Sequence, residues 1–192
     1  MKPISLTEQM PRLYAENATK ESLTGLLAYS DAAHERLGRD YWHSLVVRMS
    51  VASDAASLSE WKFEMLASQA LRTLATEEAQ EARVLVLATD SATPLPDCVK
   101  TWFESGHIAD SAHRQTGWLI VLLSEISGYS GRYWPELEYI TDIATLSSRE
   151  LVIYAVPSSE RYNPFHLADI KCVDRNGIFP VREFRELRAL TG

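Results

Sequence analysis

The chain has 192 residues, of which 46% are hydrophobic and 23% charged, so it is long enough to bury a core and is neither fibrous nor disordered in composition. Its formal net charge of −7 is spread evenly, since residues 1–80 carry 8 basic and 11 acidic side chains (−3) and residues 81–192 carry 11 and 15 (−4). Neither half is basic, which argues against a broad binding face for the phosphates of a duplex nucleic acid.

The two cysteines, Cys98 and Cys172, lack the spacing of a metal site or a redox pair, and we expect both to be buried thiols. The segment MKPISLTEQM contains no apolar signal region, and the apolar runs elsewhere are far shorter than the ~20 residues of a membrane span. We therefore expect a cytoplasmic protein that does not cross a membrane. The even spread of charge argues against nucleic-acid binding, and a small basic patch stays open.

The first elements are predicted from short patterns. Residues 1–12 contain two prolines and are expected to lead into the domain. Residues 13–15 are apolar and are followed by the polar Glu16, which predicts a brief first strand. From Thr19 onward, leucines recur at three- and four-residue intervals, which predicts a helix that Gly38 ends.

Residues 40–54 fit two structures. Apolar and polar side chains alternate over 45–51, as in a strand, yet apolar residues also recur at four-residue intervals, as in a helix. We take the strand and leave the helix open. A second alternating pattern predicts a strand over 61–66, and an acidic amphipathic pattern predicts a helix over 71–81.

Three continuous apolar runs in the second half of the chain predict strands that are buried on both faces: 84–88, 118–123 and 151–156. Helices are predicted between them, one beginning near Pro96 and one over 135–146. Alternating strands and helices with short connections are typical of right-handed crossovers onto a parallel sheet.

Beyond Glu160 this alternation ends. The sequence predicts a turn, then a hairpin on Asp174–Gly177 and a short helix over 182–190. We therefore predict one α/β domain over residues 1–192, with 161–192 as a C-terminal extension. Its core is expected to be a three-layer αβα sandwich with a mostly parallel five-stranded sheet of the flavodoxin- or receiver-like kind.

Polar side chains follow each predicted strand. In open α/β sheets ligands bind beyond the carboxyl ends of the strands, where loops and helix N-termini converge. The predicted edge, which serves a ligand or a partner, consists of Glu16, Asp90, Ser91, Ser124, Glu125, Ser158 and Glu160. Its carboxylates could hold a divalent cation, and its hydroxyls a small polar ligand. The alternative interpretation is that these loops are polar only because their backbones need water.

Four aromatic residues lie in predicted loops near the same edge: Tyr129, Tyr133, Trp134 and Tyr162. Such rings could stack on a flavin or a base, or anchor a protein partner. No serine lies in a nucleophile-elbow pattern, and no histidine has a partner at metal-ligand spacing.

Several of these residues resemble the receiver domains of two-component signalling. The resemblance rests on Asp90 with Pro94 four positions on, Ser124 after the next strand and Pro157 after the last. It implies that Asp90 is the phosphoryl acceptor, that Ser124 reports its state, and that Asp90 and Glu16 hold Mg²⁺. In receivers a lysine precedes the proline, and here that position is Val156.

This departure has a chemical consequence. A lysine would neutralise charge on the transferred phosphoryl group, and an apolar side chain cannot. The resemblance therefore implies a pseudo-receiver, a regulatory or interaction module that works by contact, with no catalytic residue and no required cofactor.

Two other hypotheses stay open. One is a flavodoxin-like binder or enzyme for a flavin or nucleotide, using the aromatic loops. The other is an acidic immunity protein that neutralises a basic toxin, suggested by the charge of −7. A protein partner is expected in two of the three cases, and a homodimer stays open.

Overall fold

The computed structural model describes residues 22–49, 51–105, 117–125, 134–157, 171–174 and 177–180. Its strands are β1 (Leu23–Tyr29), β2 (Ala56–Lys62), β3 (Val84–Asp90), β4 (Gly117–Glu125), β5 (Arg149–Pro157), β6 (Lys171–Asp174) and β7 (Gly177–Pro180). Its helices are α2 (Ala32–Arg48), α3 (Gln69–Glu81), α4 (Asp97–Glu104) and α5 (Leu137–Leu146), with short 3-10 turns η1 (Ser53–Ala55) and η2 (Phe63–Ala67).

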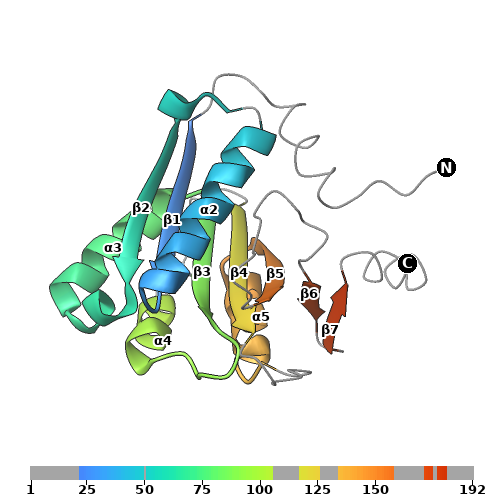
Figure 1. The fold of residues 1–192 in the computed structure, drawn as a ribbon. Coiled ribbons are helices and arrows are strands. Elements are labelled where there is room, and N and C mark those ends of the chain that lie inside the picture. Colours follow the sequence, from blue (N-terminus) through green and yellow to red (C-terminus); the bar gives the residue numbers. More distant parts are fainter. Residues whose placement is uncertain are drawn as a thin grey trace.

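The strands form one sheet in the order β2-β1-β3-β4-β5-β6-β7 (Figure 1). The first five strands in this order are parallel, and β6 and β7 add an antiparallel hairpin beside β5. The predicted α/β fold, its parallel five-stranded sheet and the C-terminal hairpin are therefore confirmed. The predicted helix over 182–190 and the strand over 13–15 lie outside the described residues.

Helices cover both faces of the sheet. Helix α2 packs on one face, where its aromatic and aliphatic side chains join a core cluster with β1, β3 and β4. Helices α3, α4 and α5 pack on the other face around a larger cluster that includes Trp102, Phe103 and Ile140. The three layers are visible in Figure 1, with α2 in front of the strands. Among the described residues no helix is long and apolar enough to cross a membrane.

The prediction for residues 19–54 is wrong in two places. The leucines from 23 to 27 belong to strand β1, and the helix begins only at Ala32. Strand β1 is buried almost throughout, so its sequence shows no alternation that would distinguish it from a helix. Residues 45–48, predicted as strand, form the end of α2, where Leu45 and Val46 are buried and Val47 is exposed.

Gly38 does not end a helix but lies inside α2. A Cβ at this position would come within 2.3 Å of a methyl group of Leu27, and a Cβ at Gly25 would come within 2.4 Å of the Trp42 ring. These two glycines let α2 approach β1 closely. The strand predicted over 61–66 is also partly wrong, because β2 ends at Lys62 and a 3-10 turn follows that buries Phe63 and Leu66.

Candidate functional site

The carboxyl ends of β1, β3 and β4 meet where the chain order of the sheet reverses. Strand β1 lies between β2 and β3, so the chain leaves β1 toward one side and later returns to its other side. The connections diverge at this point, which leaves a crevice beyond the strand ends in open α/β sheets. The residues at this place are Ser30 and Asp31 after β1, Asp90 and Ser91 at the end of β3, and Ser124 on β4.

Asp31 begins helix α2. Its Oδ1 atom accepts hydrogen bonds from the backbone amides of Ala33 (2.8 Å) and His34 (3.1 Å), which satisfies two of the free donors of the first turn. The same Oδ1 lies 2.9 Å from Nδ1 of the His34 ring. The cap therefore fixes both the start of the helix and one side of the imidazole.

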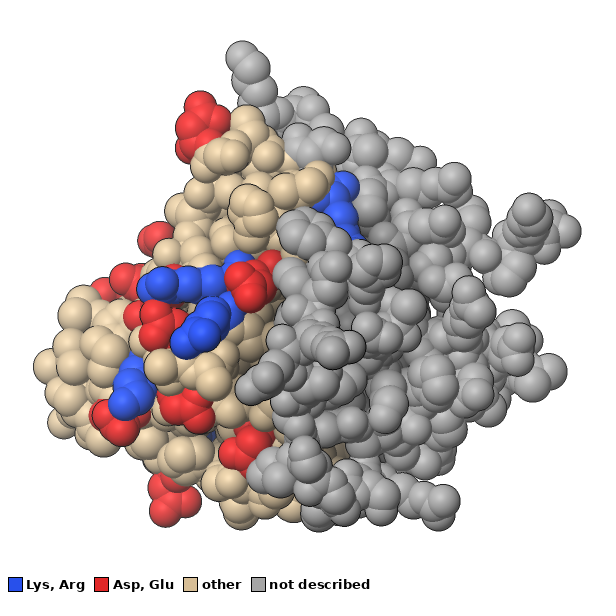
Figure 2. All heavy atoms as spheres, in the orientation of Figure 1, with Lys and Arg blue, Asp and Glu red and all other residues tan. Residues whose placement is uncertain are grey.

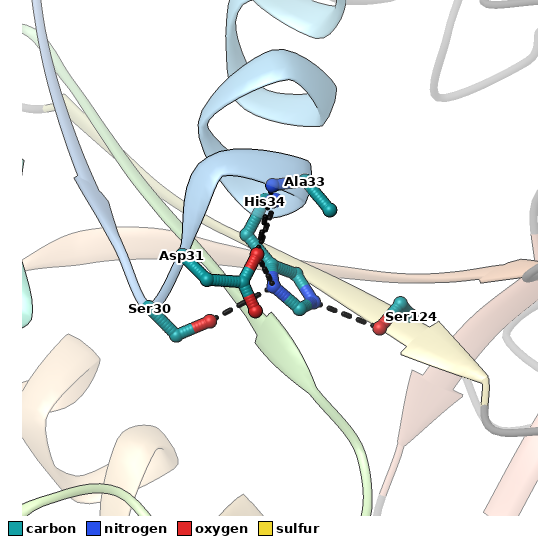
Figure 3. Close-up of polar contacts among 5 residues, drawn as sticks. All are labelled: Ser30, Asp31, Ala33, His34 and Ser124. Carbon is teal, nitrogen blue, oxygen red and sulfur yellow. Dashed lines mark hydrogen bonds and ion pairs between the residues drawn. The ribbon is translucent and has the colours of Figure 1, made fainter.

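The other side of the His34 ring contacts a different part of the sheet. Its Nε2 atom lies 2.8 Å from Oγ of Ser124, which is 90 positions away in the chain. Figure 3 shows the ring between the loop after β1 and the end of β4, with Ser30 Oγ also 2.9 Å from Nδ1. Asp31, His34 and Ser124 thus form one row of polar contacts across the carboxyl edge.

The protonation states of Asp31 and His34 follow from their hydrogen-bond and charge partners. Partial burial raises the pKa of the Asp31 carboxyl, but the hydrogen bonds and charge interaction with His34 and the Ala33 amide outweigh it, so the pKa lies below its ordinary value. An ionised carboxylate can only accept, which favours a proton on Nδ1 of His34. In that tautomer Nε2 is free to accept the hydroxyl proton of Ser124. The His34 side chain is 9% exposed, whereas that of Asp31 is 59% exposed.

The end of β3 carries two further polar groups. Asp90 Oδ1 accepts from the amides of Ala92 (2.9 Å) and Thr93 (2.6 Å), which closes a turn after the strand. Ser91 is only 4% exposed, and its hydroxyl has no hydrogen-bond partner among the described residues. A buried hydroxyl without a partner costs folding free energy, so it points to a group that a ligand or water serves.

Strand register brings the predicted residues into one row. Asp90 pairs with Ser124, and Ser124 pairs with Val156, on three adjacent parallel strands. Glu125 pairs with Pro157 one position further on. Of the predicted edge residues, Asp90, Ser91, Ser124 and Glu125 therefore lie together at the carboxyl edge.

The remaining predicted residues divide into two groups. Trp134 is 2% exposed within the core cluster of α3 to α5, so it is not available as an aromatic contact at the surface. The others lie outside the described residues: Glu16, Tyr129, Tyr133, Ser158, Glu160 and Tyr162. Within the described part of the chain, no group of three His, Cys, Asp or Glu side chains could hold a metal ion.

The sequence prediction missed Ser30, Asp31 and His34. These residues were assigned to the middle of a helix, where a serine and an aspartate have no special role. The sequence does contain a signal for a strand end here, because LTGLLAY is followed by Ser-Asp just as RVLVLAT is followed by Asp-Ser. Asp is also a preferred N-cap residue of helices.

No protein-family model and no curated protein matches the chain. Among solved structures, an oxidoreductase from Corynebacterium diphtheriae has a TM-score of 0.50 at 13% identity, covering 86% of this chain and 91% of its own. Smu.1420 from Streptococcus mutans UA159 has a TM-score of 0.43 at 10% identity, covering 73% and 90%. The first likeness supports the α/β fold, and at this identity it does not extend to activity.

Proposed function

We propose that this protein is a cytoplasmic regulatory or protein-interaction module of the receiver-like type, which acts through contacts at the carboxyl edge of its sheet. The observation that carries the proposal is the row Asp90, Ser124 and Val156 on adjacent strands. Receiver domains have the same order of five strands. They place an acceptor aspartate, a hydroxyl and a lysine in the corresponding positions.

Two features favour contact over phosphoryl transfer. Val156 stands next to Ser124 in the register, so the position of the receiver lysine is apolar. The acid that follows β1 is Asp31, whose Oδ1 is already bound by two amides and by the His34 ring. One of the two oxygens of this carboxylate is therefore already occupied, which weakens Asp31 as a ligand for Mg²⁺ at the acceptor site.

A protein partner fits the surface better than a nucleic acid. On the face shown in Figure 2, basic side chains lie among acidic ones. Arg39 pairs with Glu35 at 2.7 Å and Lys62 pairs with Glu64 at 2.9 Å, so these cations are partly neutralised. Phosphate binding needs unneutralised cations along a stripe.

The proposal is tested by placing a photocrosslinking amino acid at Ala92, which is exposed beside the edge, in the protein expressed in its own host. The matched control carries it at Ser57, which is exposed near the opposite end of the sheet. We expect one discrete protein to be crosslinked from position 92 and not from position 57. Equal crosslinking from both positions would overturn the proposal, and capture of a basic toxin would support the immunity hypothesis instead.

A second arm tests the chemistry. Purified protein is incubated with acetyl phosphate and Mg²⁺, and its intact mass is measured for the wild type and Asp90→Asn. We expect no phosphoryl group on either protein. Phosphorylation that depends on Asp90 would show an active receiver and overturn the contact mechanism.

A small-ligand function is the second candidate, favoured by the buried hydroxyl of Ser91 at the edge. Flavodoxins bind FMN at the same reversal of strand order. Bound flavin or nucleotide in the purified protein, seen by absorbance and lost on denaturation, would support this candidate over the first.

A further inference from the structure

We propose that Ser124 is a nucleophile that reacts with activated acyl groups, with His34 as its general base and Asp31 as the positioning residue. This activity goes beyond the proposed contact function and does not depend on it. The observation is the unbroken row of polar contacts from Asp31 Oδ1 to His34 Nδ1 (an ion-pair contact of 2.9 Å) and from His34 Nε2 to Ser124 Oγ (a hydrogen bond of 2.8 Å).

The geometry meets the two distance conditions for an activated serine. The nucleophile lies within hydrogen-bond reach of a base, and the base is oriented by a third group on its other nitrogen. Three separate elements supply the three residues: the loop after β1, helix α2 and strand β4. Close packing of α2 on β1, which Gly25 and Gly38 permit, fixes the helix that carries His34.

Burial is also distributed as this chemistry requires. His34 is 7% exposed, so its ring is shielded from water and its hydrogen bonds are strengthened. Ser124 is only partly buried, at the carboxyl edge where a substrate can approach. A shielded base beside a reachable hydroxyl is the arrangement of acyl-transfer sites.

The reaction with an aryl ester is a single acyl transfer. The Oγ–H bond of Ser124 breaks and its proton passes to Nε2 of His34, while a bond forms between Oγ and the carbonyl carbon. The bond from that carbon to the aryloxide breaks, and the aryloxide leaves as an anion. The products are O-acyl-Ser124 and the phenolate, and the imidazolium returns its proton to the solvent.

We expect one slow transfer and not efficient turnover. The backbone amides at the end of β3 are already engaged, that of Ser91 with the carbonyl oxygen of Ser124 (3.1 Å) and those of Ala92 and Thr93 with Asp90. These donors are not free to stabilise an oxyanion. Such stabilisation is usually the largest contribution to the rate of acyl transfer. Hydrolysis of the acyl-serine is expected to be slow for the same reason, so the acylated protein should accumulate.

The test uses p-nitrophenyl acetate with the full chain. Release of p-nitrophenolate is followed by absorbance, and the acetylated residue is located by peptide mass spectrometry. We expect one acetyl group on Ser124 and none on Ser57, an exposed serine that serves as the reference. Ser124→Ala should abolish this adduct.

Further variants separate activation from ordinary serine reactivity. His34→Gln should slow acetylation of Ser124 by about 100-fold, the usual contribution of a general base. Asp31→Asn keeps a good helix cap and should change the melting temperature little, yet it should slow acetylation, because it removes the negative charge that stabilises the imidazolium formed when His34 takes the proton. Ser30→Ala removes the hydroxyl that also contacts Nδ1 and shows whether Ser30, and not Asp31, positions the ring. Thr73→Ala, on helix α3, is the control that should leave the rate unchanged.

Several results would overturn the proposal. They are acetylation of other residues only, a Ser124 rate that is unchanged in His34→Gln, and a rate that falls in Ser30→Ala but not in Asp31→Asn. None of them bears on the crosslinking from position 92, so failure here is distinguishable from failure of the proposed function.

Discussion

Both edges of the parallel sheet carry polar side chains that are at least partly buried, but the side chains bond to different partners at the two edges. At the amino edge, Arg149 donates from Nη2 to the carbonyl oxygens of Ala79 and Ala82, both at 2.9 Å, at the end of helix α3. Thr24 donates to the carbonyl oxygen of Glu81 at 2.8 Å. Each of these bonds ends on the backbone, so its partner cannot change without moving the chain.

At the carboxyl edge side chains also contact one another. His34 contacts Asp31 on one nitrogen and Ser124 on the other. The hydroxyl of Ser91, whose amide donates to the carbonyl oxygen of Ser124, is buried without a partner among the described residues. The amino edge therefore fixes the structure, whereas the carboxyl edge has side chains that are available for chemistry.

The largest expected effect is at the amino edge. Arg149→Ala should lower the free energy of unfolding by about 3 kcal/mol, because it leaves several buried carbonyl groups without a donor. Arg149→Lys should recover only part of this loss, since an ammonium group cannot reproduce the planar fork of donors. Urea unfolding measures both. Burial lowers the pKa of Arg149 to about 10, so the guanidinium is still charged at neutral pH.

The Arg149 variants also test whether the two edges are independent. Acetylation of Ser124 should be unaffected by Arg149→Lys, because the two sites lie at opposite ends of the strands. A loss below about 1 kcal/mol in Arg149→Ala would mean that water replaces the guanidinium, and the amino edge would then not be a structural anchor.

The next effect is at the carboxyl edge. His34→Ala should lower the free energy of unfolding by about 2 kcal/mol, because it removes a buried ring and leaves Ser124 without its partner. Ser124→Ala should cost about 1 kcal/mol, the net value of one hydrogen bond. Chemical denaturation of both variants and the double variant gives the coupling between them. Full additivity would contradict a direct His34–Ser124 bond.

The sequence predicted the centre of this fold better than its first third. Strands β3, β4 and β5 are continuous apolar runs with polar ends. Where such runs alternate with helices along the chain, they indicate buried strands of a parallel sheet. Strand β1 is as buried but contains leucines at helical spacing and a glycine, so pattern alone favoured a helix. Gly25 leaves room for the Trp42 ring, which only the tertiary structure brings next to it.

The candidate site divides in the same way. Asp90 and Ser124 were predicted, because each follows a recognisable strand. His34 was not, because the strand before it was assigned to a helix and because its partner Ser124 is 90 positions away. The packing of α2 across β1 creates that contact, and no local pattern in the sequence encodes it.

A smaller effect with the opposite sign is expected at Ser91. Ser91→Ala removes a buried hydroxyl that has no partner among the described residues, so it should raise the free energy of unfolding by about 1 kcal/mol. Thr76→Val is the matched control, because the buried Thr76 hydroxyl does donate, to the carbonyl oxygen of Arg72 at 2.8 Å, and its loss should destabilise. Equal destabilisation of both variants would show that Ser91 is already satisfied by water.

The smallest expected effect concerns Asp31 and acid. Its pKa is lower in the folded protein than the ordinary value, so ionised Asp31 stabilises the fold above the unfolded pKa of about 3.9, and this contribution is lost as pH falls through the folded pKa. The side chain is 59% exposed, so solvent screening keeps the contribution below about 1 kcal/mol. Asp31→Asn keeps the cap, and its unfolding free energy should therefore fall less steeply than that of the wild type between roughly pH 5 and pH 3, as urea titrations at each pH will show. Parallel slopes for the two proteins would mean that neither the amides of Ala33 and His34 nor the His34 ring favours the charged carboxylate, and Asp31 would then not be the group that positions the imidazole.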